Sequence, residues 1–275
     1  MSATNPPLRR RALVTGASSG IGAATARLLV REGYRVALLA RDEIRLRRLA
    51  QELEPAPSAG EPRTLVLPCD VREPERLERA FHELDRAFGG LDLLVNNAGL
   101  GYRARVAELE PALLRQTFET NVLGVLLACR SALPLLRKSE RAVVVNVASV
   151  VGRRGIPGQA AYSASKAAVV SIGEALRLEW RADRIAVCTL NPGLTATGFF
   201  EAQPNPSRLA PPDLRDADPA ERVARAVLEL DRQPRAELSL RRKWAWLALL
   251  SQLAPRLGDR VLARRLGGDW DRHAT

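Results

Sequence analysis

Tyr162 and Lys166 are the residues of this sequence that most directly suggest catalysis. They lie four positions apart in a segment with helical periodicity, so their side chains share one face. A free tyrosine has a pKa of about 10 and is a poor base at neutral pH. A nearby ammonium group favours the phenolate, so we expect Lys166 to lower the pKa of Tyr162 and Tyr162 to exchange a proton with a substrate oxygen. The same spacing is common on ordinary helix surfaces, so other residues must support this interpretation.

Two polar residues earlier in the chain fit the same reaction. Ser149 follows a predicted strand, thirteen residues before Tyr162, and its hydroxyl could bind a substrate oxygen as charge develops there. It could equally cap a turn. Asn121 adjoins the apolar stretch 122–127, where a buried amide without partners would cost free energy. We therefore expect Asn121 to have defined hydrogen-bond partners.

A glycine-rich loop, residues 15–22, lies directly between the first predicted strand and the first predicted helix. Glycines allow a tight turn and a close approach of the backbone to a ligand, and the helix N-terminus offers free N–H groups to a pyrophosphate. This strand–loop–helix context predicts a dinucleotide site. Its expected contacts are Gly16, Ser18, Ser19, Gly20, Ile21 and Gly22.

The end of the second predicted strand indicates which dinucleotide binds. An acidic residue there would hydrogen-bond a ribose 2′-hydroxyl, whereas arginine suits a 2′-phosphate. The uncharged Ala40 occupies the strand end and Arg41 follows it, so we expect NADP(H) in preference to NAD(H). Arg41 could also be a solvated residue beside a helix that Asp42 caps.

Short apolar runs alternate with helix-period segments along residues 8–240. Strands this apolar require helices on both faces, so we predict an α/β fold, a Rossmann-type doubly wound parallel sheet in a single domain. The expected strands are 11–15, 35–40, 64–67, 91–95, 142–147, 185–190 and 236–240, and the expected helices are 21–32, 43–53, 74–88, 113–136, 160–181 and 221–231. Residues 55–62 read as a loop, and about 194–218 as a proline-rich substrate lid with a short helix.

These segments together resemble the short-chain dehydrogenase/reductase (SDR) family, in its compact single-domain branch. The resemblance is carried by Thr15–Gly22, Asn96–Gly99, Asn121, Ser149 and Tyr162–Lys166. It implies hydride transfer between a nicotinamide and a carbonyl or alcohol carbon, with Asn121, Ser149, Tyr162 and Lys166 as the catalytic residues. In this family Lys166 would also hold the nicotinamide ribose, and Asn121 would order a water relay.

The resemblance implies further cofactor contacts. Asp70 and Val71 would lie near the adenine, and Asn97, Ala98 and Gly99 beside the central strand. Pro192, Gly193, Thr195 and Thr197 would lie over the nicotinamide carboxamide. Phe199 and Phe200 could contact an apolar substrate, such as a lipid-like or steroid-like ketone, or pack the lid onto the body.

Composition excludes several other classes of protein. Three separated cysteines and two histidines cannot form a disulfide framework or a histidine-based metal centre, so no metal site is expected. No apolar stretch approaches the ~18 residues of a membrane span, and we expect a cytoplasmic protein. The net charge of +11 comes from scattered arginines without a basic arm, so nucleic acid is not an expected partner.

Residues 241–275 form a basic and apolar helical tail that the resemblance does not cover. Seven consecutive apolar residues, 244–250, follow the basic run 241–243. We expect this tail to pack on the substrate cleft or on a partner subunit, with peripheral contact to a membrane as the alternative. The family's usual C-terminal Asp-Gly-Gly turn is absent, so a homodimer is expected in preference to a tetramer.

Two other functions remain open on the same scaffold. One is a catalytically silent NADP(H)-sensing protein, against which the presence of Tyr162 speaks. The other is an SDR-type epimerase or dehydratase, whose longer chain and differently spaced glycine loop this sequence does not match.

Overall fold

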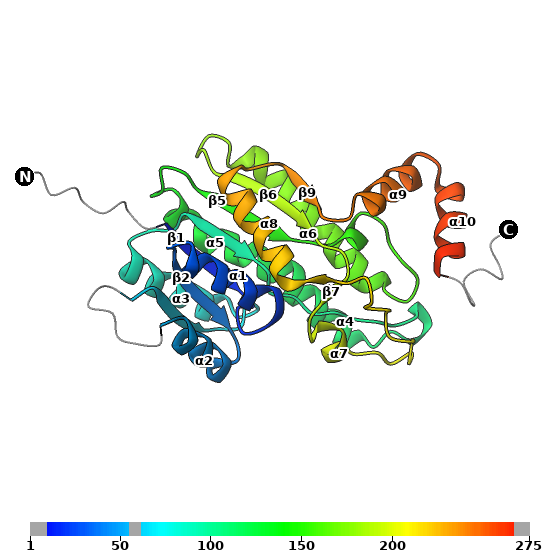
Figure 1. Ribbon diagram of the computed structural model, residues 1–275, viewed down its shortest axis with the longest axis horizontal. Coiled ribbons are helices and arrows are strands. Elements are labelled where there is room, and N and C mark those ends of the chain that lie inside the picture. The colour runs from blue at the N-terminus through cyan, green and yellow to red at the C-terminus, as the bar shows by residue number, and fades with distance from the viewer. Residues whose placement is uncertain (1–9, 55–61, 267–275) are drawn as a thin grey trace, which may run out of the picture.

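A seven-stranded parallel sheet forms the centre of the protein (Figure 1). The structure is a computed structural model that describes residues 10–54 and 62–266. The strand order β3-β2-β1-β4-β5-β6-β9 reverses direction between β1 and β4, which creates the switch point where ligands bind in such sheets. The strands are β1 (Arg11–Thr15), β2 (Arg35–Ala40), β3 (Thr64–Pro68), β4 (Leu93–Asn96), β5 (Val143–Val147), β6 (Ala186–Asn191) and β9 (Glu237–Ser239).

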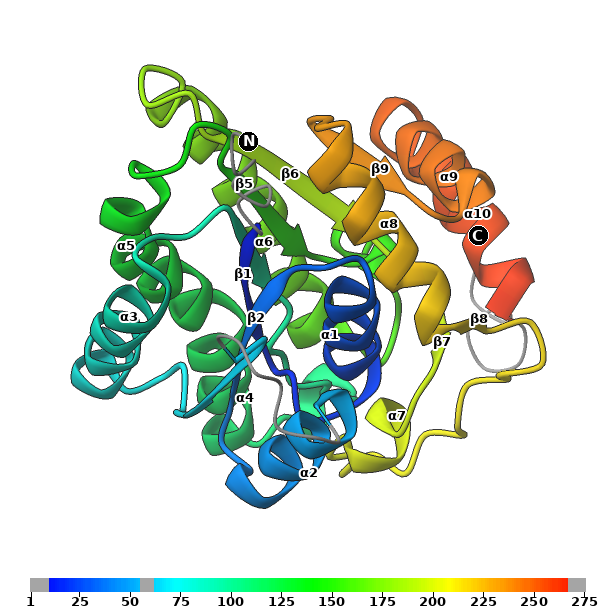
Figure 2. The same ribbon diagram turned by 60° about the vertical axis from the view of Figure 1, so that its left-hand side comes forward.

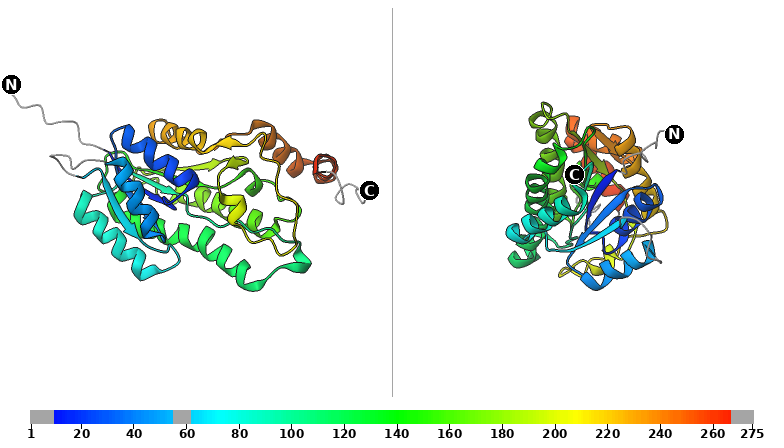
Figure 3. Two further views of the ribbon diagram at one scale, coloured as in Figure 1. Left: turned by 60° about the horizontal axis from the view of Figure 1, so that its bottom comes forward. Right: turned by 90° about the vertical axis from the view of Figure 1, so that its left-hand side faces the viewer.

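Helices cover both faces of the sheet, as Figures 2 and 3 show. One face carries α1, α2 and α8, and the other carries α3, α5 and α6, with α4 continuing into α5. Because both faces are covered, strands such as β5 are buried at every position. The predicted fold is confirmed. The helices are α1 (Gly20–Arg31), α2 (Glu43–Leu53), α3 (Pro74–Phe88), α4 (Pro111–Phe118), α5 (Gly124–Leu136), α6 (Ala160–Glu179) and α8 (Ala220–Arg232).

Local sequence signals set several helix ends. The side chain of Asp42 accepts a hydrogen bond from the backbone N–H of Arg45 (3.0 Å) and so caps α2. Helix α3 begins with Pro74 and ends at Gly89, which has the left-handed conformation (φ 71°) favoured by glycine. These signals explain why the predicted helix boundaries lie within one or two residues of the observed ones.

Helices α4 and α5 form one continuous helix interrupted by a π-helical turn, Glu119–Leu123. This helix, Pro111–Leu136, is the one helix in the described part of the chain that is long and apolar enough to cross a membrane, and half of its apolar window is buried. Its α5 part contributes Val125, Ala128 and Ala132 to the core against the sheet. No local pattern in the sequence predicts the π-helical turn.

The predicted lid lies between β6 and α8. It contains the short parallel pair β7 (Thr195–Ala196) and β8 (Asp218–Pro219), with the four-residue helix α7 (Phe199–Ala202) between them. The backbone N–H of Arg103 donates to the carbonyl of Pro204 (3.0 Å), and Arg105 N donates to Ser207 Oγ (2.8 Å). The lid is thus held against the segment that follows β4. The loop expected at 55–62 lies outside the described residues, apart from Pro62.

The tail forms a helical hairpin of α9 (Arg242–Leu253) and α10 (Pro255–Leu266). Leu247 and Leu262 are buried, and Ser251 lies so close to Gly258 that a Cβ on this glycine would come within 2.7 Å of the Ser251 Cα. Asp259 of α10 pairs with Arg154, which connects the hairpin to the loop after β5. Figure 1 shows the hairpin extending from the end of the sheet at which β9 ends. The last predicted tail residues, 267–275, lie outside the described part of the chain.

Two ionic clusters close the amino-terminal edge of the sheet. Asp231 is fully buried and accepts hydrogen bonds from Arg10 and from the hydroxyl of Tyr34 (2.5 Å). Asp92 accepts from the backbone N–H and the guanidinium of Arg11 (2.8 and 2.9 Å) and from Ser139 (2.6 Å). Both clusters lie at the end of the sheet opposite the glycine loop.

Candidate active site

The glycine loop has the conformation that a dinucleotide site requires. Gly16 (φ 66°) and Gly20 (φ 53°) adopt left-handed conformations, which side chains other than glycine rarely accept. A Cβ on Gly22 would lie 2.7 Å from Asn97 Nδ2, so only glycine allows α1 to pack this closely. The Ser19 side chain makes no capping hydrogen bond, which leaves the N–H groups at the start of α1 available to a phosphate.

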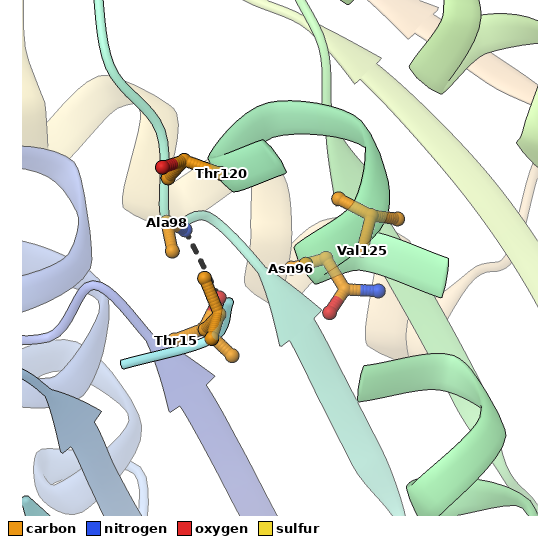
Figure 4. Close-up of a pocket in the computed structure, with 7 residues that line it drawn as sticks. Thr15, Asn96, Ala98, Thr120 and Val125 are labelled. Carbon is orange, nitrogen blue, oxygen red and sulfur yellow. Dashed lines mark hydrogen bonds between the residues drawn. The ribbon is translucent and has the colours of Figure 1, made fainter. Parts of the chain in front are cut away.

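Thr15 and Asn97 join the ends of β1 and β4. The Thr15 hydroxyl accepts hydrogen bonds from the backbone N–H groups of Asn97 (2.9 Å) and Ala98 (3.0 Å), the second of which is drawn in Figure 4. Asn97 Nδ2 donates in turn to the carbonyl of Thr15 (3.0 Å). These bonds fix the floor of the site on which Gly99 and the glycine loop rest. A void too narrow for a water molecule lies beside them, lined by Thr15, Val71, Asn96, Ala98, Thr120, Gly124 and Val125.

Asn121 lies in the π-helical turn and is fully buried. Its Oδ1 accepts from the backbone N–H of Leu100 (2.7 Å), and its Nδ2 donates to the carbonyl of Leu100 (2.9 Å) and to Ser165 Oγ (2.9 Å). The expected partners of this amide are therefore present. Asn121 thus connects the segment after β4 to helix α6 through Ser165, the residue before Lys166.

Tyr162, Ser149 and Lys166 meet beyond the ends of β5 and β6. Ser149 follows β5 and hydrogen-bonds with the Tyr162 hydroxyl. Ser149 Oγ also accepts weakly from the backbone N–H of Val151 (3.4 Å), so it caps the short turn there as well. Lys166 Nζ lies 5.9 Å from the centre of the Tyr162 ring and donates to the carbonyl of Val147 (2.9 Å).

Burial controls the ionisation of this cluster. It raises the pKa of Tyr162 well above its ordinary value, and the hydrogen bond with Ser149 only partly opposes this effect. Burial also lowers the pKa of Lys166 to about 8. The expectation that Lys166 lowers the pKa of Tyr162 is therefore wrong for this structure, because desolvation of the phenolate outweighs the other influences on it. Tyr162 therefore keeps its proton and can act as a proton donor.

Arg41 and Asp70 lie at the ends of neighbouring strands, β2 and β3. Arg41 is exposed and makes no hydrogen bond or ion pair with other described residues, whereas Asp42 is engaged at the start of α2. Asp70 accepts from Arg72 (2.7 Å), and although burial raises the pKa of Asp70, its bonds with Arg72 outweigh burial and lower it. Val71 is buried beside Asp70.

Residues 192–197 return to the site after β6. The carbonyl of Pro192 accepts from the backbone N–H of Val150 (3.0 Å), and Thr195 Oγ1 donates to the carbonyl of Gly193 (3.2 Å). The side chain of Thr197 lies against the glycine loop, since a Cβ on Gly20 would come within 3.3 Å of Thr197 Cγ2. The segment that begins the lid thus crosses from Ser149 towards the glycine loop.

The lid brings two aromatic rings to the tyrosine. The Phe199 ring lies 5.8 Å from the Tyr162 ring, and Phe200 packs edge-on against Phe199 at 5.5 Å between centroids. Gly101 lies directly against the Phe199 ring, because a Cβ on this glycine would come within 2.9 Å of the ring and would also meet Gln203. Sequence reasoning missed Gly101 and the hydrogen bond by which the backbone N–H of Arg103 holds the lid at Pro204. Only their position three to five residues after Ala98 could have suggested them.

The fold therefore gathers the predicted site residues along one edge of the sheet. The glycine loop lies in the middle, Arg41 and Asp70 lie on the β2–β3 side, and the tyrosine cluster lies on the β5–β6 side. A glycine-rich loop of this conformation next to a half-buried proton donor defines a class, the dinucleotide-dependent oxidoreductases.

Comparison with known proteins identifies the family within this class. The short chain dehydrogenase family model matches residues 10–207. An uncharacterized oxidoreductase of Mycobacterium tuberculosis is 35% identical over 92% of this chain and 97% of its own length. The protein belongs to the short-chain dehydrogenase/reductase family and is an NAD(P)-dependent oxidoreductase.

Solved structures of relatives agree with this fold. An SDR from Burkholderia phymatum in complex with NAD has a TM-score of 0.80 at 28% identity, covering 90% of this chain and 95% of its own. An alcohol dehydrogenase from Thermococcus sibiricus complexed with 5-hydroxy-NADP has a TM-score of 0.73 at 30% identity, covering 85% and 96%. Relatives of this fold thus bind either NAD or an NADP derivative.

Proposed function

We propose that this protein is an NADP(H)-dependent reductase of apolar ketones or aldehydes, or a dehydrogenase of the corresponding alcohols. The environment of Arg41 is the observation that carries the cofactor assignment. Arg41 follows β2 with an exposed guanidinium that makes no hydrogen bond or ion pair to other described residues and interacts with Asp70 only through charge, in the position where a ribose 2′-phosphate would lie. The neighbouring carboxylate, Asp42, caps α2 and pairs with Arg45 (3.2 Å), so both of its oxygens already have partners within α2.

Tyr162, Ser149 and Lys166 have different roles in the proposed reaction. When bound, the nicotinamide supplies or accepts hydride. Tyr162 donates its proton to the substrate oxygen as charge develops there, and its raised pKa keeps that proton in place until then. Ser149 hydrogen-bonds to the same oxygen. Lys166, whose pKa burial lowers to about 8, would hold the ribose hydroxyls of the bound cofactor with the ammonium that here donates to the carbonyl of Val147.

Two aromatic rings beside Tyr162 favour an apolar substrate. Phe199 and Phe200 lie half-buried beside Tyr162, and they offer an aromatic surface at the place where the substituents of a carbonyl would extend. We therefore propose ketones with hydrocarbon substituents as the substrate class. A homodimer and a cytoplasmic site of action remain part of this proposal.

Cofactor preference is tested by binding measurements with NADPH and NADH. Arg41→Ala should weaken NADPH binding by about tenfold and leave NADH binding nearly unchanged, because it removes one charge-assisted hydrogen bond to the 2′-phosphate. Arg47→Ala is the matched control, since Arg47 is an exposed arginine of α2 that pairs with Glu43. Equal weakening of both cofactors by Arg41→Ala would refute the assignment.

Turnover is tested by following NADPH oxidation with a panel of carbonyls from small ketones to long-chain and steroid ketones. Tyr162→Phe should abolish turnover while NADPH binding persists. Retained turnover would exclude Tyr162 as the proton donor. Tight NADPH binding without turnover of any panel member would favour the silent sensing protein instead.

A further inference from the structure

The outer face of the tail hairpin exposes an unusual number of large apolar side chains. In α9, Trp246 is 67% exposed and Leu253 is 78% exposed, although Leu247 and Ala248 on the other side of the same helix are buried. A helix that is apolar on both sides needs cover on both. The exposed apolar residues of the hairpin are Trp246, Leu249, Leu253, Leu257, Val261 and Leu266.

Nothing in the described part of the chain covers this outer face. An open hollow of about 220 Å³ lies at its base, lined by Ser239, Arg242, Ala245, Trp246 and Leu249. The two helices pack against each other with Leu247 and Leu262 buried, and none of the exposed apolar residues belongs to the core of the sheet and its helices.

Positively charged residues are interspersed with the exposed apolar residues along both helices of the hairpin. The described cations Arg242, Lys243, Arg256, Arg260 and Arg264 form no ion pair with other described residues. Asp259 is the acidic residue of the two helices, and its carboxylate is engaged by Arg154. The hairpin therefore presents apolar side chains flanked by uncompensated positive charge.

This charge distinguishes between the two occupants that could cover the face. A second copy docked by two-fold symmetry would bring one positively charged face against another and create repulsion. An anionic lipid surface offers the opposite charge and takes up tryptophan and leucine side chains at the interface. Each helix of twelve residues is about 18 Å long, too short to cross a bilayer.

We propose that the α9–α10 hairpin docks the protein on anionic membrane surfaces without spanning them. The inference goes beyond the proposed function and does not depend on turnover. Helix α9 follows the carboxyl end of β9 (Figure 1), and Ser149 follows the carboxyl end of the parallel strand β5, so docking places the active site on the side of the protein that faces the lipid surface.

Vesicle flotation with the full chain tests the proposal. Vesicles of phosphatidylcholine alone are compared with vesicles that also contain phosphatidylglycerol, at low and high salt. The protein should float with the anionic vesicles, and much less with the neutral ones or at high salt. The double variant Trp246→Ser, Leu253→Ser should bind at least about tenfold more weakly.

Leu178→Ser is the matched control, because Leu178 is 76% exposed on α6, far from the tail in sequence. It should float like the unaltered protein, and all variants should keep the same unfolding temperature, since the substituted side chains are exposed. Absence of binding to anionic vesicles would overturn the proposal. An equal loss of vesicle binding on Leu178→Ser would also overturn it. A dimer that light scattering detects and the double variant abolishes would overturn it as well.

Discussion

Asn121 offers the sharpest test of how the site is held together. Its amide makes three hydrogen bonds, two of them to the backbone of Leu100 and one to Ser165. Asn121→Leu keeps a similar volume and removes all three. The backbone N–H and carbonyl of Leu100 then lose their partners, while Ser165 keeps its bond to the Tyr162 carbonyl (2.7 Å).

The magnitude follows from these lost partners. A buried polar group left unsatisfied costs about 1–3 kcal/mol, so two such groups give roughly 2–6 kcal/mol. Leu100 is half-buried, so its freed groups regain some hydration and the lower part of that range applies. We expect the free energy of unfolding to fall by about 2–3 kcal/mol, equivalent to a Tm lower by roughly 5–10 °C.

Urea denaturation and thermal unfolding measure this loss, with Thr117→Val as the control. Thr117 is also buried in this helix, but its hydroxyl donates only to the carbonyl of Leu113 one turn earlier (2.8 Å). We expect the control to cost less than about 1 kcal/mol. If Asn121→Leu costs no more than Thr117→Val, Asn121 does not tie the segment after β4 to α6, and the reasoning fails.

Three further substitutions test other parts of the structure. Burial raises the pKa of Asp92, but its bonds from Arg11 and Ser139 outweigh burial and lower it, so its stabilising effect is present above about pH 4 and disappears as the pH falls through its folded-state pKa. Asp92→Asn should therefore reduce the free energy of unfolding by about 2 kcal/mol at pH 7, and the difference from the unaltered protein should shrink in acid denaturation. Gly101→Ala should push Phe199 from Tyr162 and change KM for apolar ketones several-fold, whereas Gly155→Ala, with nothing within 4 Å of the added Cβ, should leave steady-state kinetics unchanged. Tyr34→Phe should cost about 1–3 kcal/mol in urea denaturation, because the buried Asp231 loses a hydrogen bond; an unchanged midpoint would show that Arg10 suffices.

Most of the fold could be predicted from the sequence because its signals are local and agree with one another. The runs that became β1, β2 and β5 are continuously apolar, as strands covered on both faces must be. Pro74 and Asp42 mark helix starts by side-chain chemistry that acts within one turn. The last strand, β9, was predicted one residue too long at each end, because only residues 237–239 pair with β6.

The parts that could not be predicted depend on contacts between distant segments. Asn121 lies in the π-helical turn and contacts Leu100, and no local sequence pattern predicts this turn. The pKa of Tyr162 depends on how completely the lid and α6 remove it from water, which its spacing from Lys166 does not reveal. The lid contact with Gly101 joins residues about a hundred positions apart.

Asp218 at the base of the lid has a consequence for dissecting this protein. Its buried carboxylate accepts from Arg222 (2.5 Å) and from Arg241 Nε (2.9 Å), the residue immediately before α9. A truncation that ends at Leu240 would leave this carboxylate with one cation instead of two, and a truncation that ends at Arg241 would keep both. A truncation that removes the tail should therefore cut after Arg241, because a one-residue difference in that boundary decides whether lost activity reports on the tail or on the lid.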